Sequence, residues 1–460
     1  MSRDIKKIYF IGIGGIGMSA IARYMISQGA EVYGYDRKET VLTRKLAAEG
    51  MIIHYDDDPK QIPEGVELVV YTPAIPTDHK ELIWFRSNGY DVVKRSEMLG
   101  VLSESKKTIA VAGTHGKTST SSTIAHILTH GNYEVSAFIG GIMSNYDSNY
   151  IEGSGDWIIL EADEYDRSFL KLRPNISIVI SMDADHLDIY GEEQSMVDSF
   201  NKFIQLTAVD GQLILKHELR ENLTVETVEV LKTNRVEVIT YGVQAEADVM
   251  ICKVVVKDEH FDFALLQGDV VLTGLTSKMP GRHNVENATA ALIASMYAGA
   301  SYQDVKQGLE SFKGIKRRFE LIHDSKSGTY IDDYAHHPTE LKAAISAARE
   351  LYSGRKILGI FQPHLYSRTR DFAYGFAKEL DELDEVILLD VYPARELPIE
   401  GVSSQLIYEK MKLKSKTLTT KEKLMSVLVE KEIDVIITLG AGDIDLFVPQ
   451  IREWLEQNKS

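Results

Sequence analysis

Two glycine-rich segments of the sequence have the composition of phosphate-binding loops. The first, GIGGIGMS, places Gly12, Gly14 and Gly17 between a predicted strand and a predicted helix. Exposed backbone amides at a helix start can hold a diphosphate. Asp36 closes the next predicted strand, where a ribose hydroxyl is usually bound. The same loop can bind any nucleotide diphosphate, and it can also be only a tight turn between strand and helix. It therefore predicts diphosphate binding, with NAD as one alternative ligand.

The second segment, GTHGKTS, also stands between a predicted strand and a predicted helix. Lys117 would place a positive charge near the β and γ phosphates of ATP, and the Thr118 hydroxyl can reach magnesium. Only two residues separate Gly113 from Gly116, whereas the usual pattern has four. The Gly-Lys-Thr order at a helix start nevertheless predicts ATP binding. The residues expected to bind it are Gly113, Thr114, His115, Gly116, Lys117, Thr118 and Ser119.

Carboxylates and a histidine follow the next two predicted strands. Glu161 comes directly after WIIL, and His186 follows ISMDAD. The carboxyl ends of parallel strands meet at one edge of a sheet, so either residue could join Thr118 around a magnesium ion. The same two loops also contain Asp163, Glu164, Asp166, Asp183, Asp185 and Asp188. Because magnesium prefers oxygen ligands, this chemistry alone favours the aspartates over His186.

Two later segments combine imidazoles with guanidiniums. DDYAHHP follows a predicted strand and contains Asp332, Asp333, Tyr334, His336 and His337. QPHLYSRTRD is expected to place His364, Arg368 and Arg370 at the end of the next strand. Arginine forks suit bidentate carboxylate binding, and cationic groups stabilise developing negative charge. We therefore expect a carboxylate site here, although either histidine alone would be an ordinary surface residue.

The elements that position these motifs alternate between short apolar strands and helices, which is typical of parallel α/β domains. The predicted fold is α/β with three domains. These are a Rossmann-like domain (1–106), a central P-loop ATPase domain (107–314) and a C-terminal Rossmann-like domain (315–460). From about residue 211 to residue 277 the strands alternate in polarity. This change predicts an antiparallel addition to the central domain.

Composition excludes several classes of protein. The 460 residues include 51 Lys and Arg against 68 Asp and Glu, a net charge of -17. Such a surface does not suit nucleic acid or anionic membranes. The single cysteine, Cys252, permits no intrachain disulfide or cysteine-based metal centre. No apolar run reaches the ~18 residues of a membrane span, and the N-terminus lacks a signal peptide's apolar core. We expect a cytoplasmic protein without membrane insertion, either a monomer or a homodimer.

The order of the motifs closely resembles the Mur ligase family of peptidoglycan synthesis. The motifs, spread between about residues 7 and 445, are GIGGIGMS, GTHGKTST, EADEYDRSFL, DADHLDIYG, GRHNVENATAA, IKRRFE, DDYAHHPTE, QPHLYSRTRD and LGAGDI. Within the family, the resemblance is to the branch that joins L-alanine to the lactyl carboxylate of UDP-N-acetylmuramate. It implies ATP as cosubstrate, magnesium as cofactor, an acyl phosphate intermediate, and a role in cell wall biogenesis, cell shape and cell division.

The resemblance also implies roles for individual residues. UDP-sugar binding is implied for Gly14, Gly15, Gly17, Met18, Ser19 and Asp36. The implied metal ligands are Thr118, Glu161 and His186, which overrules the preference for the aspartates. Further ATP contacts are implied for His283, Asn284, Asn287, Arg318 and Asp333. L-Alanine would be bound by Tyr334, His336 and Arg368. The catalytic set would be Lys117, His186, His336 and Arg368.

Three departures from the family pattern and three alternatives remain. Leu365 stands where some relatives have arginine, Ala335 replaces a frequent glycine, and Tyr165 replaces a frequent serine. Lys202 receives no role, and the group that deprotonates the amine is not assigned. An NAD-dependent dehydrogenase would leave GTHGKTS without a function. Non-catalytic ATP binding is the second alternative. The closest is a recycling ligase that adds a preformed tripeptide to the same UDP-sugar, although DDYAHHP and HLYSRTR favour a single amino acid.

Overall fold

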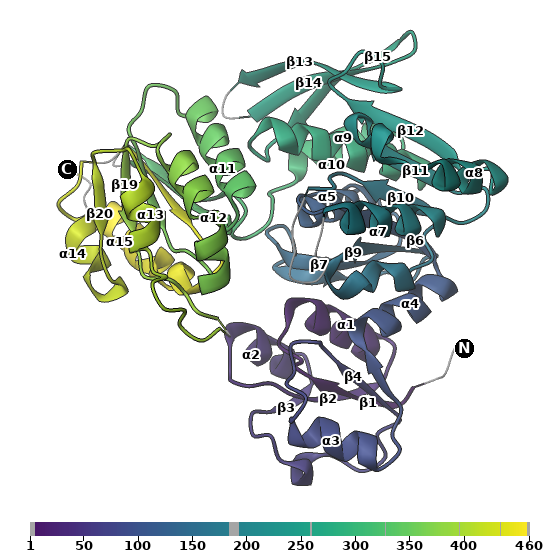
Figure 1. Cartoon of the computed structure of the whole chain (residues 1–460). Helices are drawn as coiled ribbons and strands as arrows, with labels where there is room; N and C mark the ends of the chain where they lie inside the picture. The colour runs from purple at the N-terminus through teal and green to yellow at the C-terminus, as the bar shows by residue number, and fades with distance from the viewer. Residues whose placement is uncertain are drawn as a thin grey trace. The chain divides into compact units, whose positions relative to one another are not determined.

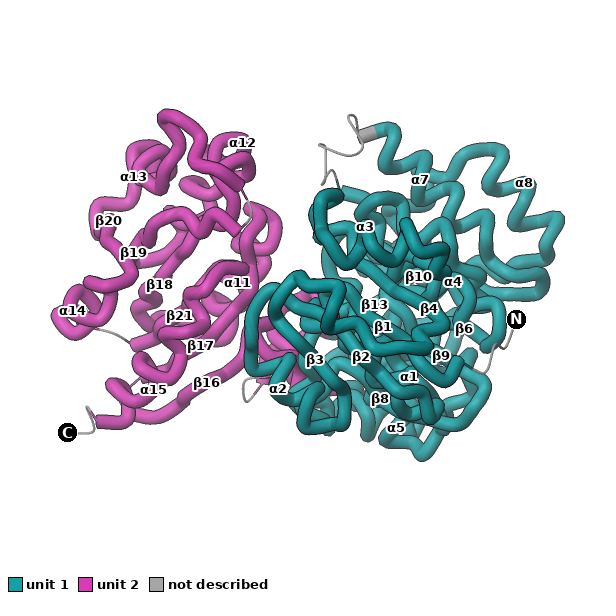
Figure 2. Tube along the Cα trace, turned by 90° about the horizontal axis from the view of Figure 1, so that it is seen from below, with its two compact units in different colours: residues 1–253, 263–275, 286–312 teal, residues 254–262, 276–285, 313–460 magenta. Residues whose placement is uncertain are grey.

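The computed structural model describes residues 5–183, 193–257, 260–326, 328–394, 396–432 and 434–457. Within these residues the strands form three sheets of five, ten and six strands (Figure 1). The chain groups into two compact units (Figure 2). One unit holds residues 1–253, 263–275 and 286–312, and the other holds residues 254–262, 276–285 and 313–460. The three-domain α/β prediction is confirmed, with one sheet in each predicted domain.

The N-terminal sheet is parallel and has the order β3-β2-β1-β4-β5. Its strands are β1 (Lys7–Ile11), β2 (Glu31–Tyr35), β3 (Ile52–His54), β4 (Leu68–Tyr71) and β5 (Val92–Lys94). Its helices are α1 (Ile16–Ser27), α2 (Val41–Ala48), η1 (Pro59–Gln61), α3 (Lys80–Ser87) and α4 (Arg95–Ser105). The strand order reverses at β1, so the first glycine loop lies at the switch point where open α/β sheets bind ligands.

The central sheet has the order β15-β14-β13-β12-β11-β10-β6-β9-β7-β8. Its first strands are β6 (Lys107–Ala112), β7 (Val135–Met143), β8 (Ser148–Ile151), β9 (Trp157–Ala162) and β10 (Ile176–Val179). The others are β11 (Gln212–Lys216), β12 (Glu237–Gly242), β13 (Val249–Lys257), β14 (His260–Gln267) and β15 (Val270–Ser277). The associated helices are α5 (Lys117–His130), η2 (Tyr165–Lys171), α7 (Glu193–Gln205), η3 (His217–Asn222), α8 (Val225–Thr233), α9 (Arg282–Tyr297) and α10 (Tyr302–Ser311).

The antiparallel addition begins later than the sequence predicts. Strand β11 pairs parallel with β10, and β12 pairs parallel with β11. The physical reason is that helix α8 connects β11 to β12 and provides the crossover that parallel neighbours need. Strands β14 and β15 are neighbours joined by only Gly268 and Asp269, a connection that antiparallel strands alone permit.

The C-terminal sheet has the order β16-β17-β21-β18-β19-β20, with only the β16–β17 pair antiparallel. Its strands are β16 (Glu320–Ser325), β17 (Gly328–Asp333), β18 (Ile357–Phe361), β19 (Glu385–Leu388), β20 (Lys416–Leu418) and β21 (Val435–Leu439). Its helices are α11 (Pro338–Leu351), α12 (Tyr366–Leu380), α13 (Gln405–Lys410), η4 (Lys421–Lys423), α14 (Leu424–Leu428), η5 (Asp443–Phe447) and α15 (Val448–Gln457). Consecutive residues Tyr330 and Ile331 belong to different apolar clusters, so both faces of this sheet are covered.

The placement of the RTR segment corrects one expectation. Arg368 and Arg370 lie in the first turns of α12 rather than at the end of a strand. The chain leaves β18 at Phe361, and Leu365 caps the helix with a positive φ of 68°. Among the described residues, no helix is both long enough and apolar enough to cross a membrane.

Candidate functional site

The predicted ATP loop runs from the end of β6 to the start of α5. A Cβ atom at Gly113 would lie 2.6 Å from Ile180 Cγ1, and one at Gly116 would lie 2.9 Å from Asn287 Oδ1. Gly116 also has a φ of +82°, a conformation that favours glycine. Both glycines are therefore required by the packing of the loop. The contact also brings Asn287, one of the predicted ATP ligands, beside the loop.

Ser181 holds the other side of this loop, a role that the sequence did not reveal. Its Oγ accepts the His115 backbone N–H at 3.0 Å and lies 3.0 Å from Thr114 Oγ1. The Asp183 backbone N–H donates to Thr114 Oγ1 at 3.1 Å. A serine after a strand carries no motif signal. Its position opposite the loop follows from the parallel pairing of β6 with β10.

Lys117 begins α5 and is held on three sides by oxygen atoms. Its Nζ donates to the Gly113 carbonyl at 2.5 Å and to the two carboxylate oxygens of Glu164 at 2.9 and 2.6 Å. Burial alone would lower the pKa of Lys117, but the Glu164 and Asp163 carboxylates outweigh it and raise that pKa. A positive charge is therefore fixed beside the loop at the N-terminus of α5, as phosphate binding requires.

Thr118 and Glu161, two of the three predicted metal ligands, lie side by side. The Thr118 hydroxyl donates to Glu161 Oε2 at 3.1 Å. Glu161 Oε1 accepts the Ser121 hydroxyl at 3.2 Å and the Gly140 N–H at 2.5 Å. A hydroxyl and an oriented carboxylate are hard oxygen ligands, so these residues fit a magnesium ion. His186, the third predicted ligand, lies outside the described residues.

Three acidic residues near Glu161 have other partners. Asp163 Oδ2 accepts a hydrogen bond from Arg95 at 2.9 Å. Asp166 pairs with Lys94 at 2.8 Å. Glu164, as described above, neutralises Lys117. Asp185 and Asp188 lie outside the described residues.

The residues predicted at the start of α9 divide into two groups. Asn284 donates from its side-chain amide to the Pro280 carbonyl at 2.6 Å and so closes the turn that begins the helix. His283 packs against the same turn, because a Cβ at Gly281 would lie 2.5 Å from His283 Cε1. Asn287, one turn further on, lies beside Gly116. Contact with ATP through His283 and Asn284 remains a prediction.

The first glycine loop forms a hydrogen bond with Asp36, the acidic residue after the second strand. Gly14 N–H donates to Asp36 Oδ2 at 2.7 Å, so the predicted pair is brought together. The next two predicted residues, Met18 and Ser19, are buried. The Ser19 hydroxyl donates to the Ile16 carbonyl at 2.9 Å. Asp36 thus shapes the loop itself, and binding of the UDP-sugar by these residues remains a prediction.

In the C-terminal sheet the predicted residues gather after β17. Asp333 accepts backbone N–H groups from Phe319 at 2.6 Å and from Ala335 at 2.7 Å. Burial raises the pKa of Asp333 to about 7, although these two bonds oppose the shift. Asp333 therefore fixes the backbone around the next residue, Tyr334.

Three arginines lie around Tyr334. Desolvation of its hydroxyl raises the pKa of Tyr334 although the residue is 37% exposed, while the charges of Arg317, Arg318 and Arg368 oppose the increase. The Arg317 guanidinium lies over the tyrosine ring at 5.1 Å and donates to the Gly440 carbonyl at 2.6 Å. The sequence motifs indicate no role for Arg317. Its position in IKRRFE, directly before Arg318, was the available signal.

The predicted histidine also belongs to this group. The His336 ring lies edge-on to Tyr334 at 5.2 Å and to His364 at 5.8 Å. Arg370, by contrast, is exposed and pairs with Asp371 at 2.7 Å. The structure therefore separates Arg368, which acts on Tyr334, from Arg370, which does not contribute to the group. A region rich in guanidiniums suits a carboxylate or a phosphate.

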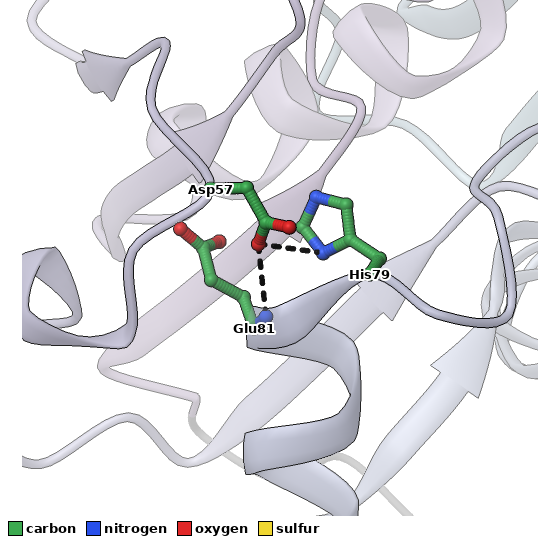
Figure 3. Close-up of side chains that lie close together, drawn as sticks. All are labelled: Asp57, His79 and Glu81. Carbon is green, nitrogen blue, oxygen red and sulfur yellow. Dashed lines mark hydrogen bonds and ion pairs between the residues drawn. The ribbon is translucent and has the colours of Figure 1, made fainter.

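A different cluster in the N-terminal sheet has a structural role (Figure 3). Ligand atoms of Asp57, His79 and Glu81 lie within 4.8 Å of one another. However, the Asp57 carboxylate accepts backbone N–H groups from Lys80 at 2.9 Å and from Glu81 at 3.0 Å. Glu81 Oε2 accepts the Tyr9 hydroxyl at 2.7 Å. We therefore assign Asp57 to capping helix α3.

Together these features indicate a class of protein. A glycine loop with a fixed lysine, an adjacent hydroxyl and carboxylate, and a group of arginines on a separate sheet are the parts expected of a nucleotide-dependent multidomain α/β enzyme. Three family descriptions match the chain in order. They are the Mur ligase family, catalytic domain, over residues 7–107; the Mur ligase middle domain, over 111–295; and the Mur ligase, glutamate ligase domain, over 317–442. The chain belongs to the Mur ligase family.

Similar proteins extend over nearly the whole chain. A UDP-N-acetylmuramate--L-alanine ligase from Cytophaga hutchinsonii is 46% identical, covering 98% of this chain and 97% of the relative. A UDP-N-acetylmuramate--L-alanine ligase from Porphyromonas gingivalis is 45% identical, covering 98% of this chain and 99% of the relative. The crystal structure of a UDP-N-acetylmuramate-alanine ligase from Thermotoga maritima has a TM-score of 0.83 and 29% identity, covering 98% of this chain and all 100% of that one. A murein peptide ligase from Psychrobacter arcticus has a TM-score of 0.70 at 21% identity, with 99% of each chain covered, which shows a shared fold.

Proposed function

We propose that this protein is an ATP-dependent ligase that joins L-alanine to the lactyl carboxylate of UDP-N-acetylmuramate, with release of ADP and phosphate. The observation that carries the proposal is the 46% and 45% identity, over 98% of the chain, to ligases of that name. The geometry supports the proposal, because Lys117 is fixed beside the glycine loop at the start of α5 and Arg317 lies over the Tyr334 ring in the C-terminal sheet. The product would serve peptidoglycan synthesis.

The first chemical step activates a poor acyl donor. A carboxylate oxygen of the UDP-sugar attacks the γ-phosphorus of ATP, the bond to the β-phosphate oxygen breaks, and ADP leaves. Lys117 neutralises charge on the transferred group from its fixed position at α5. Thr118 and Glu161 would hold magnesium, which supplies further charge neutralisation when it is bound. The product is an acyl phosphate.

The second step forms the amide. The neutral amine of L-alanine attacks the acyl carbon, and phosphate leaves from the tetrahedral intermediate while the amine loses a proton. Arg368 is proposed to bind the alanine carboxylate, with Tyr334 and His336 beside it. Arg318 and Asp333 are proposed to lie near the nucleotide.

The UDP-sugar is assigned to the first glycine loop, at the switch point of the N-terminal sheet. ATP and a UDP-sugar are both cytoplasmic metabolites, which supports a cytoplasmic enzyme. A monomer or a homodimer would suffice, because the proposed groups all come from one chain.

Acceptor choice tests this proposal against the recycling ligase. Purified protein would receive ATP, magnesium and UDP-N-acetylmuramate together with either L-alanine or the tripeptide, while ADP release and product mass are measured. We expect turnover with L-alanine. Preference for the tripeptide would select the recycling ligase, and ATP binding without ADP release under any acceptor would select a non-catalytic protein.

A further inference from the structure

Arg95 contacts the first turn of α1, which carries the proposed UDP-sugar loop. A Cβ atom at Gly17 would lie 2.9 Å from Arg95 Nη1 and 3.4 Å from Arg95 Cζ. Gly17 therefore lacks a side chain where the guanidinium comes close. The backbone N–H groups in the first turn of a helix have no acceptor within the helix. Arg95 thus adds a full positive charge beside backbone donors that already favour an anion.

The other side of the same guanidinium contacts the loop that follows β9. Arg95 Nη2 donates to Asp163 Oδ2 at 2.9 Å. Asp163 also fixes its own loop, since its Oδ1 accepts the Tyr165 N–H at 3.1 Å and its carbonyl accepts the Phe169 N–H at 2.9 Å. The next residue, Glu164, is the partner of Lys117. A continuous chain of contacts therefore joins the first glycine loop to the ATP loop.

Lys94 makes a neighbouring contact of a different kind. It pairs with Asp166 at 2.8 Å, but the two side chains are 40% and 44% exposed. The Arg95 and Asp163 side chains are less exposed, at 20% and 36%. Exposed ion pairs contribute little to stability, and only Arg95 also contacts the α1 turn. Arg95, rather than Lys94, is thus placed to connect the two loops.

We propose that Arg95 binds the diphosphate of the UDP-sugar and positions the ATP loop through Asp163. The inference rests on the proposed function, because that function supplies the diphosphate. A guanidinium has five N–H donors, so Nη2 can keep Asp163 while Nη1 reaches a phosphate oxygen. The UDP-sugar and ATP would then raise each other's affinity, and by the same factor.

Two nucleotides isolate the diphosphate contact. Calorimetric titration with UDP and with UMP, which differ by one phosphate, would be carried out on wild type, Arg95→Gln and Arg95→Lys. We expect Arg95→Gln to weaken UDP binding by about tenfold, the value of one charge-assisted hydrogen bond, with little change for UMP. Arg95→Lys keeps the charge and should recover part of the loss. Arg44→Gln is the control, because that arginine is exposed and pairs with Glu39 at 2.8 Å.

A second measurement tests the positioning role. The affinity for a non-hydrolysable ATP analogue would be measured with and without UDP-N-acetylmuramate. We expect the UDP-sugar to raise the affinity for the ATP analogue in wild type. This increase in affinity should vanish in Arg95→Gln and in Asp163→Asn. The inference would be overturned, without affecting the proposed function, if Arg95→Gln weakened UDP and UMP binding equally. The same holds if the UDP-sugar raised the affinity for the ATP analogue as much in the folded variants as in wild type. Failure of wild type to bind UDP would overturn the proposed function with it.

Discussion

Lys117 Nζ lies 2.6 Å from Glu164 Oε2, and the Glu164 side chain is only 1% exposed. Burial raises the pKa of Glu164, while the ammonium charge opposes the increase. The lysine thus has two tasks. It compensates the charge of a buried carboxylate, and it places a positive charge beside the predicted ATP loop.

Lys117→Ala should abolish ligase turnover and also lower stability, since it leaves Glu164 buried without its cation. Breaking a buried pair typically costs about 3–5 kcal/mol. Phosphate release and urea unfolding measure the two effects separately. The double variant Lys117→Ala/Glu164→Gln removes the unpaired charge, so it should regain stability and remain inactive. A folded single variant with near-wild-type turnover would remove Lys117 from the site.

Arg368→Ala should raise the KM for L-alanine by about tenfold or more, because a charge-assisted pair contributes roughly 1.5–3 kcal/mol and each ~1.4 kcal/mol is one decade. The KM values for ATP and the UDP-sugar should change little. Arg370→Ala is the matched control from the same helix, and it should behave as wild type. If kcat collapsed while the alanine KM stayed constant, Arg368 would instead contact the transferred phosphate.

Titration with nucleotides should show saturable binding of UDP-N-acetylmuramate and none of NAD. The first loop matches a dinucleotide pattern, but Asp36 already accepts the Gly14 N–H at 2.7 Å. Asp36→Asn keeps an acceptor for that N–H and should retain UDP-sugar binding. Tight binding of NAD to the wild type would revive the dehydrogenase.

Gly140→Ala should raise the magnesium concentration needed for half-maximal activity. A Cβ at this position would lie 2.6 Å from Glu161 Oε2 and would displace the carboxylate from Thr118. Ser122→Ala is the control, since Ser122 lies on α5, the helix that carries Thr118, and its Oγ is buried without a hydrogen-bond partner among the described residues. A magnesium requirement equal to that of wild type would argue against Glu161 as a ligand.

His126 should make stability depend on pH. Burial lowers its pKa from 6.5 to about 4, and its ring contacts the Tyr146 hydroxyl at 2.8 Å and Ser311 Oγ at 3.0 Å. Between pH 6.5 and 4, His126 is protonated in the unfolded chain but stays neutral in the folded chain. The contribution of neutral His126 to the free energy of unfolding is therefore complete above pH 6.5. It is lost as the pH falls towards 4, by about 1.4 kcal/mol per pH unit. Urea unfolding measures the free energy of unfolding at each pH, and this free energy should depend less steeply on pH in His126→Gln than in wild type. The same pH dependence in the two proteins would contradict the assignment.

The local pattern of the sequence determined the α/β class, the two glycine loops between strand and helix, and the family. These features depend on residues that are close together in the chain, namely a short apolar strand, a glycine turn and a helix start. The pairing of Thr118 with Glu161 also followed, because parallel strands end at one edge of a sheet.

Tertiary structure decided which of several similar residues does which task. Two aspartates near the predicted metal site have other partners, since Arg95 binds Asp163 and Lys94 binds Asp166, whereas Glu161 accepts the Thr118 hydroxyl. Likewise, helix α12 brings the charge of Arg368 to Tyr334 while Arg370 is exposed. Ser181, Arg317 and Arg95 had no role assigned from sequence for the same reason. Most of their partners lie far away in the chain, and strand order and helix packing bring them together.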